Sequence, residues 1–402
     1  MNSALGSVAL ERRLEAALAE RSRANAAFFE AEAERLARLC HRMAERFARG
    51  GRLVAFGQSP AARSDVRHVA VEFVHPVIVG KRALPAIGLA AEGGSLARQV
   101  ELVAEADDIA IAFGADEPET AAALAVARER GCLTLAFAPA GADWEFLPPS
   151  EDPSVRQELV ETLYHLLWEL VHVFFEHRGL LEGREARAVH DTGASAFLYP
   201  FLGEREHDLE NVVDDVRRSI LLKADEVSSL REQTLTENAT EIAAAAAALR
   251  GNLDAGGKLL AFGNGGSATD AMDAVADFHV PPDSRWPPRR ALDLTEDPAI
   301  LTALANDIGT DAIFARQIIA YGRSGDAVLA LSTSGGSSNV VAALAEARSR
   351  GLLTIAMVGY DGGRVASERL ADHVIVTRSE HIPRIQEAQA SAYHVLRELV
   401  EL

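Results

Sequence analysis

Two loops in the C-terminal half of the chain carry residue types that bind phosphate. The first runs from Gly263 to Ser267 (GNGGS), after the apolar run Leu259–Phe262 and before a helical pattern. A strand, a glycine turn and a helix start in this order direct backbone N–H groups and a helix N-terminus at an anion. Glycines let a phosphate approach the backbone, and the Ser267 hydroxyl adds a donor. The loop therefore predicts phosphate binding, with a tight turn that binds nothing as the alternative.

The second loop, Ser332 to Asn339 (STSGGSSN), follows the apolar run Ala327–Leu331 and precedes another helical pattern. Its hydroxyl side chains form a neutral, donor-rich cup for a phosphate monoester. Ligands of open parallel sheets bind beyond the carboxyl ends of the strands, so two such loops favour a phosphate site over two solvated turns. The residues predicted to bind substrate in these loops are Asn264, Gly265, Gly266, Ser267, Ser332, Thr333, Ser334 and Ser337.

Residues of the types used in metal binding and acid–base chemistry lie in the N-terminal half. His68 and Glu72 are four residues apart in a helical pattern, which places them on one helix face. Gln157 and His165 lie eight residues apart in a later helical stretch. A His and a Glu at helical spacing also occur as an ordinary surface pair, so the spacing alone leaves both interpretations open.

Several motifs follow one another between Leu235 and Leu402: GNGGSATDA, LTEDPAILTALANDIGTDAIFARQI, LSTSGGSSNVVAALAEARSRG, GYDGG and RIQEAQASAYHVL. In this order they resemble the phosphoheptose isomerases, which belong to the SIS (sugar isomerase) fold. Those enzymes convert sedoheptulose 7-phosphate to glycero-manno-heptose 7-phosphate. The resemblance implies an α/β fold and a phosphorylated sugar as substrate.

The resemblance also implies roles for the N-terminal residues. In the family, a His/Glu pair on the first helix and a Gln/His pair on the last helix form the active site and can bind zinc. The matching residues here are His68, Glu72, Gln157 and His165, which we expect to be zinc ligands. In the family, the Glu and the last His also serve as acid and base, so Glu72 and His165 are predicted to be catalytic. Four matches in register favour a site over a surface pair.

The two halves repeat one order of elements, which predicts a tandem duplication. Arg52–Gly57 matches Lys258–Gly263, Ala106–Phe113 matches the strand Gly325–Leu331, and Ala122–Thr134 matches Ala342–Thr354. Both halves end in a helix that bears Tyr-His, at Tyr164-His165 and at Tyr393-His394. We therefore expect two tandem SIS domains, each a parallel sheet flanked by helices in three αβα layers.

The N-terminal half has lost the phosphate loops. Its first loop, Gly57–Ala62, contains one glycine, and its second, Phe113–Thr120, has three carboxylates in place of the hydroxyl run. Carboxylates repel a phosphate dianion at close range. The counterpart of Pro298–Phe314 is also mostly missing. This half is predicted not to bind a sugar phosphate in its own loops.

The C-terminal half has changed in the opposite place. Asp273 and Asp277 stand where His68 and Glu72 lie in the first half, whereas Gln386 and His394 are kept. An Asp is one methylene shorter than a Glu, so its reach to a substrate or metal differs. Asp277 and His394 are further candidates for catalytic residues, and we expect Gln386 to bind substrate. The alternatives are a hard metal ion held by the two aspartates and the histidine, and a solvated acidic face.

Further family positions concern the substrate. In the family, an Asn-Asp pair after the long Thr-Ala helix contributes to the substrate pocket, so Asp307 is a predicted substrate-binding residue, with a helix cap as the alternative. The family arginine expected within Phe278–Pro282 is absent, and Pro383 replaces an expected acidic residue. Both differences bear on which phosphosugar is bound.

Composition sets the class and the domain boundaries. A chain of 402 residues with 48% hydrophobic and 25% charged residues is typical of a globular protein with two domains. We expect a first domain at 1–185, a connector at 186–204 that is rich in glycine, and a second domain at 205–402. Two cysteines suit a reducing cytoplasm, and neither a signal peptide core nor a membrane-length apolar run is present. The net charge of −19 argues against nucleic acid or an anionic membrane as a main partner.

The reaction that the resemblance implies is an aldose–ketose proton shift on a sugar phosphate, with zinc as the cofactor. We expect no nucleotide, because the glycine loop lacks the lysine of a P-loop. The complementary losses suggest a composite site that combines Glu72 and His165 with the C-terminal phosphate loops, in a homodimer that forms a pseudo-tetramer of SIS domains. Three alternatives stay open: a C-terminal half that works alone with Asp277 and His394, a sugar-phosphate-binding or protein-binding SIS protein without catalysis, and an isomerase of another phosphosugar.

Overall fold

The computed structural model describes residues 2–77, 81–90, 93–176 and 208–402, so the predicted connector at 186–204 lies outside the described residues. The chain forms two compact units. The N-terminal unit comprises Ala24–Glu151 and Leu159–Asp225, and the C-terminal unit comprises Met1–Arg23, Asp152–Glu158 and Glu226–Leu402. The units are thus interleaved in the sequence, while the domain boundaries given above stay a prediction.

The N-terminal unit is built on a parallel sheet with the strand order β2-β1-β3-β4-β5. Its strands are β1 (Leu53–Gly57), β2 (Ala86–Ala90), β3 (Ile109–Ala112), β4 (Leu133–Ala136) and β5 (Trp144–Glu145). Every residue of β1, β3 and β4 is buried, as expected of apolar strands covered on both faces. The short polar loops at the strand ends carry the candidate residues.

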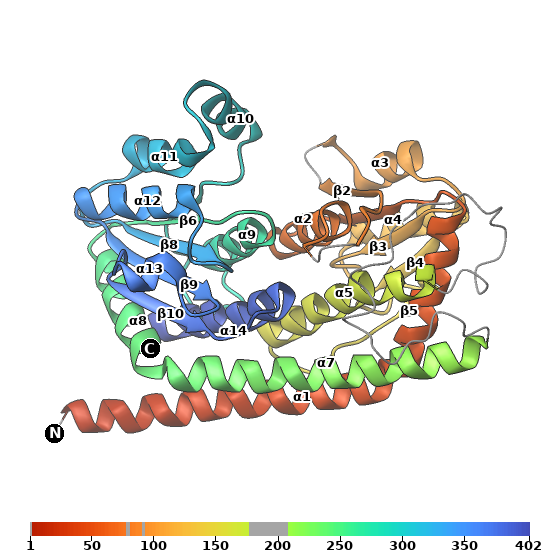
Figure 1. Ribbon diagram of the computed structural model, residues 1–402, viewed down its shortest axis with the longest axis horizontal. Coiled ribbons are helices and arrows are strands. Elements are labelled where there is room, and N and C mark those ends of the chain that lie inside the picture. The colour runs from red at the N-terminus through yellow and green to blue at the C-terminus, as the bar shows by residue number, and fades with distance from the viewer. Residues whose placement is uncertain (1, 78–80, 91–92, 177–207) are drawn as a thin grey trace. The chain divides into compact units, whose positions relative to one another are not determined.

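Helices cover this sheet (Figure 1). They are α1 (Asn2–Ala48), α2 (Pro60–Val74), α3 (Leu96–Val103), α4 (Pro118–Glu129) and α5 (Pro153–Glu176). Val54 and Phe56 of β1 pack with α3 and α4 on one face of the sheet, and α2 lies against β1 and β2. Helix α1 ends at Ala48, just before Gly50, whose φ of 95° L-residues rarely adopt.

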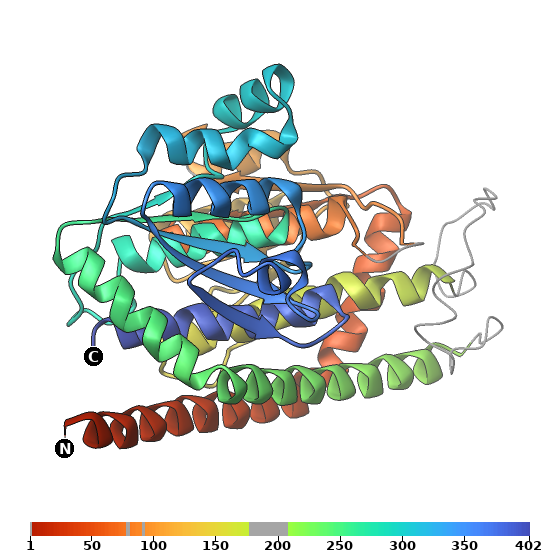
Figure 2. The ribbon, with the colours of Figure 1, turned by 60° about the vertical axis from the view of Figure 1, so that its left-hand side comes forward.

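The C-terminal unit has a second parallel sheet with the order β10-β9-β8-β6-β7. Its strands are β6 (Leu259–Phe262), β7 (Ala291–Asp293), β8 (Ala327–Ser332), β9 (Leu353–Gly359) and β10 (His373–Thr377). Alternate residues of β6 and β8 enter two separate cores. One core includes α8 (Ala239–Asp254), α9 (Gly266–His279) and α14 (Ile382–Val400), and the other includes α11 (Ile313–Tyr321), α12 (Ser338–Ser349) and α13 (Gly363–Ser367). The result is three αβα layers (Figure 2).

The predicted duplication is confirmed by the topology. Written from β7, the second sheet has the order β7-β6-β8-β9-β10, which matches β2-β1-β3-β4-β5 strand for strand. Leu53 pairs with Ala86 in the first sheet as Leu259 pairs with Ala291 in the second. Among the residues described between β2 and α3, the helices α10 (Pro298–Asp307) and η3 (Thr310–Ala312) have no counterpart, as expected.

Two helices lie between position 208 and strand β6. They are α7 (Leu209–Glu237) and α8, and they meet at Asn238. The Asn238 amide donates to the carbonyl of Val376 at 3.0 Å and accepts from the N–H of Val376 at 3.0 Å, which holds the break against strand β10. Within the described ranges, no helix is both long enough and apolar enough to cross a bilayer.

A buried aspartate lies just before β3, and another lies at the equivalent position before β8. Substitutions at these two positions test the repeat. Asp108 accepts from the backbone N–H of Arg52 at 2.7 Å and from that of Glu105 at 2.9 Å. In the same way, Asp326 accepts from the backbone N–H of Lys258 at 3.0 Å and from that of Arg323 at 2.9 Å. We expect Asp108→Ala and Asp326→Ala each to lower the free energy of unfolding by about 2–4 kcal/mol, because each leaves two backbone donors without acceptors. Urea unfolding followed by circular dichroism measures this.

The exposed Asp116, which follows β3, offers the control, and Asp116→Ala should change stability by less than about 0.5 kcal/mol. A large loss in only one of the two aspartate variants would contradict the equivalence of the two positions.

Candidate functional site

The two predicted phosphate loops lie side by side in the C-terminal unit. The first joins β6 to α9 and the second joins β8 to α12, and β6 and β8 are neighbouring parallel strands. The Asn264 amide donates to Asn339 at 3.0 Å, and the Asn339 amide donates back at 2.8 Å. This reciprocal pair joins the two loops, so the structure brings the sequence-predicted loop residues together at one edge of the sheet.

Glycines make the turns of these loops possible. A Cβ atom at Gly263 would lie 2.3 Å from the carbonyl oxygen of Ser267, and one at Gly335 would lie 2.3 Å from that of Gly362. Gly335 also has a φ of 59°, which L-residues rarely adopt. The close backbone approaches therefore require glycine at both positions.

The hydroxyl groups of the loops have two different roles. Ser332 Oγ accepts from the N–H of Gly335 at 3.1 Å, and Ser334 Oγ accepts from the N–H of Gly336 at 3.2 Å, so both shape the second loop. The hydroxyls of Ser267, Thr333 and Ser337 form no hydrogen bond with any residue that the structure describes, which leaves them able to donate to a ligand. Ser332 and Ser334 thus stabilise the second loop, whereas the other three hydroxyls are the candidate donors to a phosphate.

The residues that precede the two helices do not cap them, and in the first turn of α12 Asn339 Oδ1 accepts only from the N–H of Val340, at 2.9 Å. Gly265 precedes α9 and Ser337 precedes α12, and neither supplies a side-chain hydrogen bond to the first turn. The first N–H groups of a helix need acceptors, and the helix dipole favours an anion there. Two uncapped helix starts beside free hydroxyl groups form a site suited to a phosphate dianion.

The matching helix starts of the N-terminal unit, those of α2 and α4, both begin with a proline, which has no N–H to donate. Ser59 Oγ also accepts from the N–H of Ala62 at 3.4 Å at the start of α2. Helix α4 has no side-chain cap, and its Glu119 carboxylate accepts from the N–H of Leu96 at 2.7 Å at the start of α3. Hydrogen bonds from Ser95 and Leu96 lower the pKa of Glu119, so it stays charged there. This arrangement favours the prediction that the N-terminal loops do not bind phosphate.

Three predicted metal ligands of the N-terminal unit meet in its interior. His68 and Glu72 lie on α2 and His165 lies on α5, and at most 3% of each residue is exposed. The Nε2 atoms of His68 and His165 are 3.3 Å apart, and His68 Nε2 is 3.9 Å from Glu72 Oε1. The structure therefore brings these three residues together as the sequence predicted.

The donor set and its spacing fit a zinc ion. Zinc binds His nitrogen and carboxylate oxygen at about 2.0–2.2 Å in a tetrahedron, which separates ligand atoms by about 3.3–3.5 Å. The two imidazole nitrogens already have this separation, and one candidate atom from each of the three residues lies within 4.8 Å of the others. Glu72 Oε1, 3.9 Å from His68 Nε2, lies slightly beyond this separation.

The remaining zinc-ligand prediction, Gln157, is half-buried on the first turns of α5 and belongs to the segment Asp152–Glu158 of the C-terminal unit, so its part stays a prediction. The sequence analysis missed Glu161, a buried residue of α5 with a carboxylate oxygen within 4.8 Å of a His68 ring nitrogen. Its spacing, one helical turn before His165, is the only sequence feature that pointed to it.

A second buried cluster lies in the C-terminal unit and is centred on His394 of α14. His394 Nε2 is 3.3 Å from Asp273 Oδ2 and 3.7 Å from Asp277 Oδ2, both on α9. The Tyr393 hydroxyl donates to Asp273 at 2.8 Å. All of these residues are at least nine-tenths buried, so the alternative of a solvated acidic face is wrong.

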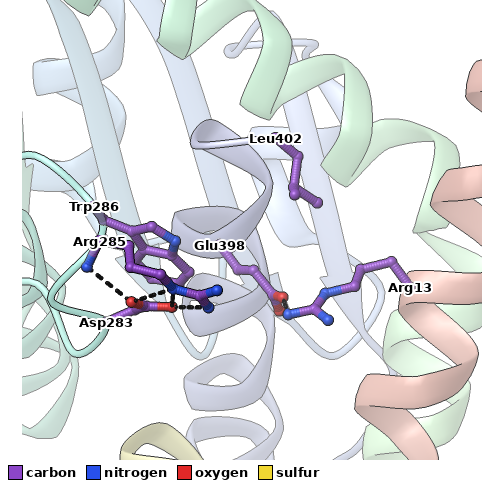
Figure 3. Close-up of a pocket in the computed structure, with 6 residues that line it drawn as sticks. All are labelled: Arg13, Asp283, Arg285, Trp286, Glu398 and Leu402. Carbon is purple, nitrogen blue, oxygen red and sulfur yellow. Dashed lines mark hydrogen bonds and ion pairs between the residues drawn. The ribbon is translucent and has the colours of Figure 1, made fainter.

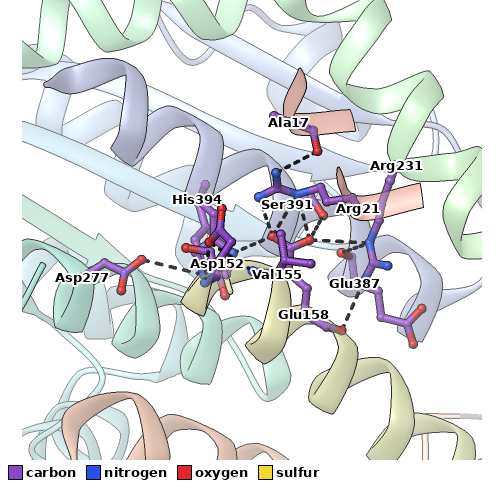
Figure 4. Close-up of polar contacts among 12 residues, drawn as sticks. Ala17, Arg21, Asp152, Val155, Glu158, Arg231, Asp277, Glu387, Ser391 and His394 are labelled. Carbon is purple, nitrogen blue, oxygen red and sulfur yellow. Dashed lines mark hydrogen bonds and ion pairs between the residues drawn. The ribbon is translucent and has the colours of Figure 1, made fainter. Parts of the chain in front are cut away.

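Glu158 is the residue of this cluster that the sequence analysis missed (Figure 4). His394 Nδ1 lies 2.9 Å from Glu158 Oε1, and Ser391 donates to Glu158 Oε2 at 2.5 Å. Arg21 of α1 donates to both carboxylate oxygens, at distances from 2.7 to 3.1 Å. The Gln-Glu pair at 157–158, repeated at 386–387, was the sequence feature that marked this position.

Burial and charge together shift the pKa values of this cluster. Burial, reinforced by the charge of Asp273, raises the pKa of Asp277 to about 7. Burial alone would lower the pKa of His394, but the carboxylates of Asp273, Glu158 and Asp277 raise it to about 10. Burial disfavours the charge of Glu158, yet Arg21 and His394 hold the pKa of Glu158 well below its usual range.

Two predicted substrate residues lie in different surroundings. Asp307 is exposed at the last turn of α10 and accepts a hydrogen bond of 2.7 Å from the neighbouring Asn306. Gln386 is buried on α14. The location of neither residue tests its role, so substrate binding by Asp307 and by Gln386 stays a prediction.

A cavity of about 360 Å³ opens elsewhere in the C-terminal unit (Figure 3). It is lined by Arg13, Asp283, Arg285, Trp286, Glu398 and Leu402. Arg13 forms an ion pair with Glu398, and Asp283 forms one with Arg285. None of these residues belongs to the phosphate loops or to the His394 cluster, so this cavity is not the predicted site.

The fold and the loops define a protein of the SIS (sugar isomerase) class. The SIS domain family matches residues 224–359. Over 96% of the chain the structure is similar to the C-terminal domain of glucosamine-fructose-6-phosphate aminotransferase from Francisella tularensis, with a TM-score of 0.59, 11% identity and 95% of that domain covered. A tagatose-6-phosphate ketose/aldose isomerase from Escherichia coli gives a TM-score of 0.54 at 13% identity, over 96% of this chain and 91% of that one. These two likenesses show the fold.

Sequence relatives identify the family. The phosphoheptose isomerase of Thermodesulfovibrio yellowstonii is 40% identical over 190 residues, which make up 47% of this chain and 92% of that enzyme. The phosphoheptose isomerase of Chlorobium phaeobacteroides is 43% identical over 175 residues, 43% of this chain and 76% of the relative. The chain belongs to the phosphoheptose isomerase family, and each relative matches less than half of it.

The raised pKa of Asp277 predicts how the free energy of unfolding depends on pH. The carboxyl keeps its proton in the folded state up to about pH 7, whereas it ionises near pH 4 when unfolded. Its contribution to stability is therefore fully present below pH 4 and is lost as the pH rises through 7. We expect Asp277→Asn to be more stable than wild type by about 2–4 kcal/mol at pH 8.5 and nearly equal to it at pH 4. Urea unfolding at the two pH values tests this, and a difference that does not change with pH would contradict it.

Proposed function

We propose that the protein interconverts a ketose phosphate and an aldose phosphate, with sedoheptulose 7-phosphate and glycero-manno-heptose 7-phosphate as the substrate pair. The observation that carries the proposal is the pair of uncapped helix starts joined through Asn264 and Asn339, which fits a phosphate monoester. Relatives named phosphoheptose isomerase that are about 40% identical support the reaction.

In this proposal, the phosphate is bound far from the carbon atoms that react. Ser267, Thr333 and Ser337 donate hydroxyl hydrogen bonds to it, and the first turns of α9 and α12 donate backbone N–H groups. Binding energy at the phosphate orients the other end of the sugar for reaction. Asp307 and Gln386 are the proposed contacts for sugar hydroxyl groups.

The proposed chemistry is a proton shift through an enediol(ate). Glu72 removes a proton from the carbon beside the carbonyl, and the C–H electron pair moves into the new carbon–carbon double bond. Glu72 then returns a proton to the former carbonyl carbon, while His165 moves the hydroxyl proton between the two oxygens. The burial of both side chains excludes water from this exchange.

The residues that would hold zinc are His68, Glu72, Gln157 and His165. A bound zinc ion would act as a Lewis acid for the two sugar oxygens. The spacing of His68, Glu72 and His165 supports this part of the proposal.

We infer that the chemistry and the phosphate binding come from different halves of the sequence. The N-terminal unit has the trio His68, Glu72 and His165, but its matching helices α2 and α4 both begin with a proline. The C-terminal unit has helix starts without a proline, but aspartates stand in place of the first two residues of the trio. A homodimer with four SIS domains, a pseudo-tetramer, is the assembly we propose for such a composite site. The free, buried Cys40 and Cys132 support a reducing, cytoplasmic location.

The activity is tested by NMR of the protein with sedoheptulose 7-phosphate in D2O, with added zinc and separately with a chelator. We expect aldose formation with deuterium uptake, and a loss of at least about a hundredfold in Glu72→Gln, because a general base is removed. Asp277→Asn separates the two candidate bases and should keep turnover. The exposed Glu129 of α4 supplies the matched control, Glu129→Gln.

The converse result, activity that survives Glu72→Gln but not Asp277→Asn, would assign the chemistry to the C-terminal unit. Bound ligand with no turnover and no solvent exchange would indicate a sugar-phosphate-binding protein. Turnover of a different phosphosugar alone would keep the reaction and reject the substrate.

The phosphate loops make a separate prediction about KM. Thr333→Ala and Ser337→Ala should each raise KM for the sugar phosphate about tenfold with a small change in kcat, because each removes a hydrogen bond to a charged group. Ser349, exposed at the far end of α12, provides the control Ser349→Ala, which should leave KM unchanged. An unchanged KM in both loop variants would contradict phosphate binding by these hydroxyls.

A further inference from the structure

Both ring nitrogens of His394 face carboxylate oxygens. Nδ1 lies 2.9 Å from Glu158 Oε1, and Nε2 lies 3.3 Å from Asp273 Oδ2. A neutral imidazole has one N–H, so it can donate at only one of these contacts and would place a lone pair against an anion at the other. An imidazolium donates at both.

The proton cannot come from Glu158, because donors already surround that carboxylate. Arg21 reaches both of its oxygens at 2.7 to 3.1 Å, and the Ser391 hydroxyl donates to Oε2 at 2.5 Å. Arg231 Nε lies 3.9 Å from the same oxygen. A carboxylate that accepts from a guanidinium and a hydroxyl is held in its charged form.

Charged groups from several elements surround His394. The acidic groups are Glu158 of α5, Asp273 and Asp277 of α9, and Asp152, which acts on Asp277. Arg21 and Arg231 pair with Glu158, and Arg397 donates to the backbone of Asp277 and pairs with Glu401. A charged His394 ring pairs with the buried carboxylates of Glu158 and Asp273, and such pairing offsets the cost of burying their charges.

His165 is the counterpart of His394 in the N-terminal unit, and its Nε2 atom faces a nitrogen where His394 Nε2 faces an oxygen. His165 Nε2 lies 3.3 Å from His68 Nε2, and His394 Nε2 lies 3.3 Å from Asp273 Oδ2. Two imidazole nitrogens at this distance can both bind a metal ion but do not stabilise a charged ring, whereas a carboxylate at the same distance stabilises an imidazolium. The change of one side chain therefore favours a protonated ring at the C-terminal position.

We propose that His394 is a permanent imidazolium held between Glu158 and Asp273, that its proton fills the C-terminal site in place of a metal ion, and that the chain binds one zinc ion, in the His68 site. Glu158 is then a positioning residue, which fixes the ring of His394 from the side opposite α9. The pKa of His394, raised to about 10, agrees with this geometry.

The protonation is tested on the full chain labelled with ¹⁵N-histidine. At pH 8 we expect His394 to show protons on both ring nitrogens, identified by their loss in His394→Gln. We expect Glu158→Gln to lower the pH at which these signals disappear, a change that a merely structural role of Glu158 would not produce. A single ring N–H at pH 8 in the wild type would overturn the proposal.

The metal count is tested by equilibrium dialysis against zinc and elemental analysis. We expect one zinc per wild-type chain, one in His394→Gln, none in His165→Gln, and two in Asp273→His, where a second imidazole joins His394. Two zinc ions in the wild type, or a zinc lost in His394→Gln, would overturn the proposal. If Asp273→His does not fold, the number of zinc ions bound by His394→Gln still tests the proposal.

The two measurements separate this inference from the isomerase function. No zinc in the wild type would reject the His68 site, while the ring protons of His394 would still be decided by NMR. An active enzyme with two zinc ions would keep the proposed function and reject the imidazolium.

Discussion

Parallel pairing of β6 with β8 is the constraint on which the candidate phosphate site depends. Because both strands run the same way in adjacent positions, their loops leave the sheet at one edge and both following helices start there. The Asn264–Asn339 pair then fixes the loops to each other, and the glycines at 263 and 335 permit backbone approaches that a Cβ would block. Donors are thus gathered before any ligand binds, which lowers the ordering cost of binding.

The duplicated architecture separates fold from chemistry. Both sheets have the same strand order, and Asp108 and Asp326 hold equivalent backbone donors. The loops and buried polar residues have diverged on this common frame. In the N-terminal unit, Ser59 caps α2 and Pro118 begins α4, whereas in the C-terminal unit the buried acidic residues surround an imidazole. Because the core depends on apolar burial, these polar positions can change without altering the topology.

The compact units do not follow the sequence halves. The segments Met1–Arg23 and Asp152–Glu158 belong to the C-terminal unit, and they supply Arg21 and Glu158 to the surroundings of His394. Sequence analysis found His394 and both aspartates by their correspondence with the first half. It missed Glu158, because the partner that gives this residue its role lies 236 positions away. The break at Asn238 was missed for the same reason, since strand β10 holds it.

The sequence by itself determined the duplicated α/β architecture, the two phosphate loops and the family. Those features depend on local patterns: apolar runs that must be buried, glycines where the backbone turns, and side-chain types at helical spacing. Only the tertiary structure decided which hydroxyls brace the loops, that His68, Glu72 and His165 meet, and that His394 faces carboxylates on both sides. Those outcomes depend on distances between side chains from separate elements, and on the charge balance that burial imposes on them, neither of which is encoded in any one stretch of the chain.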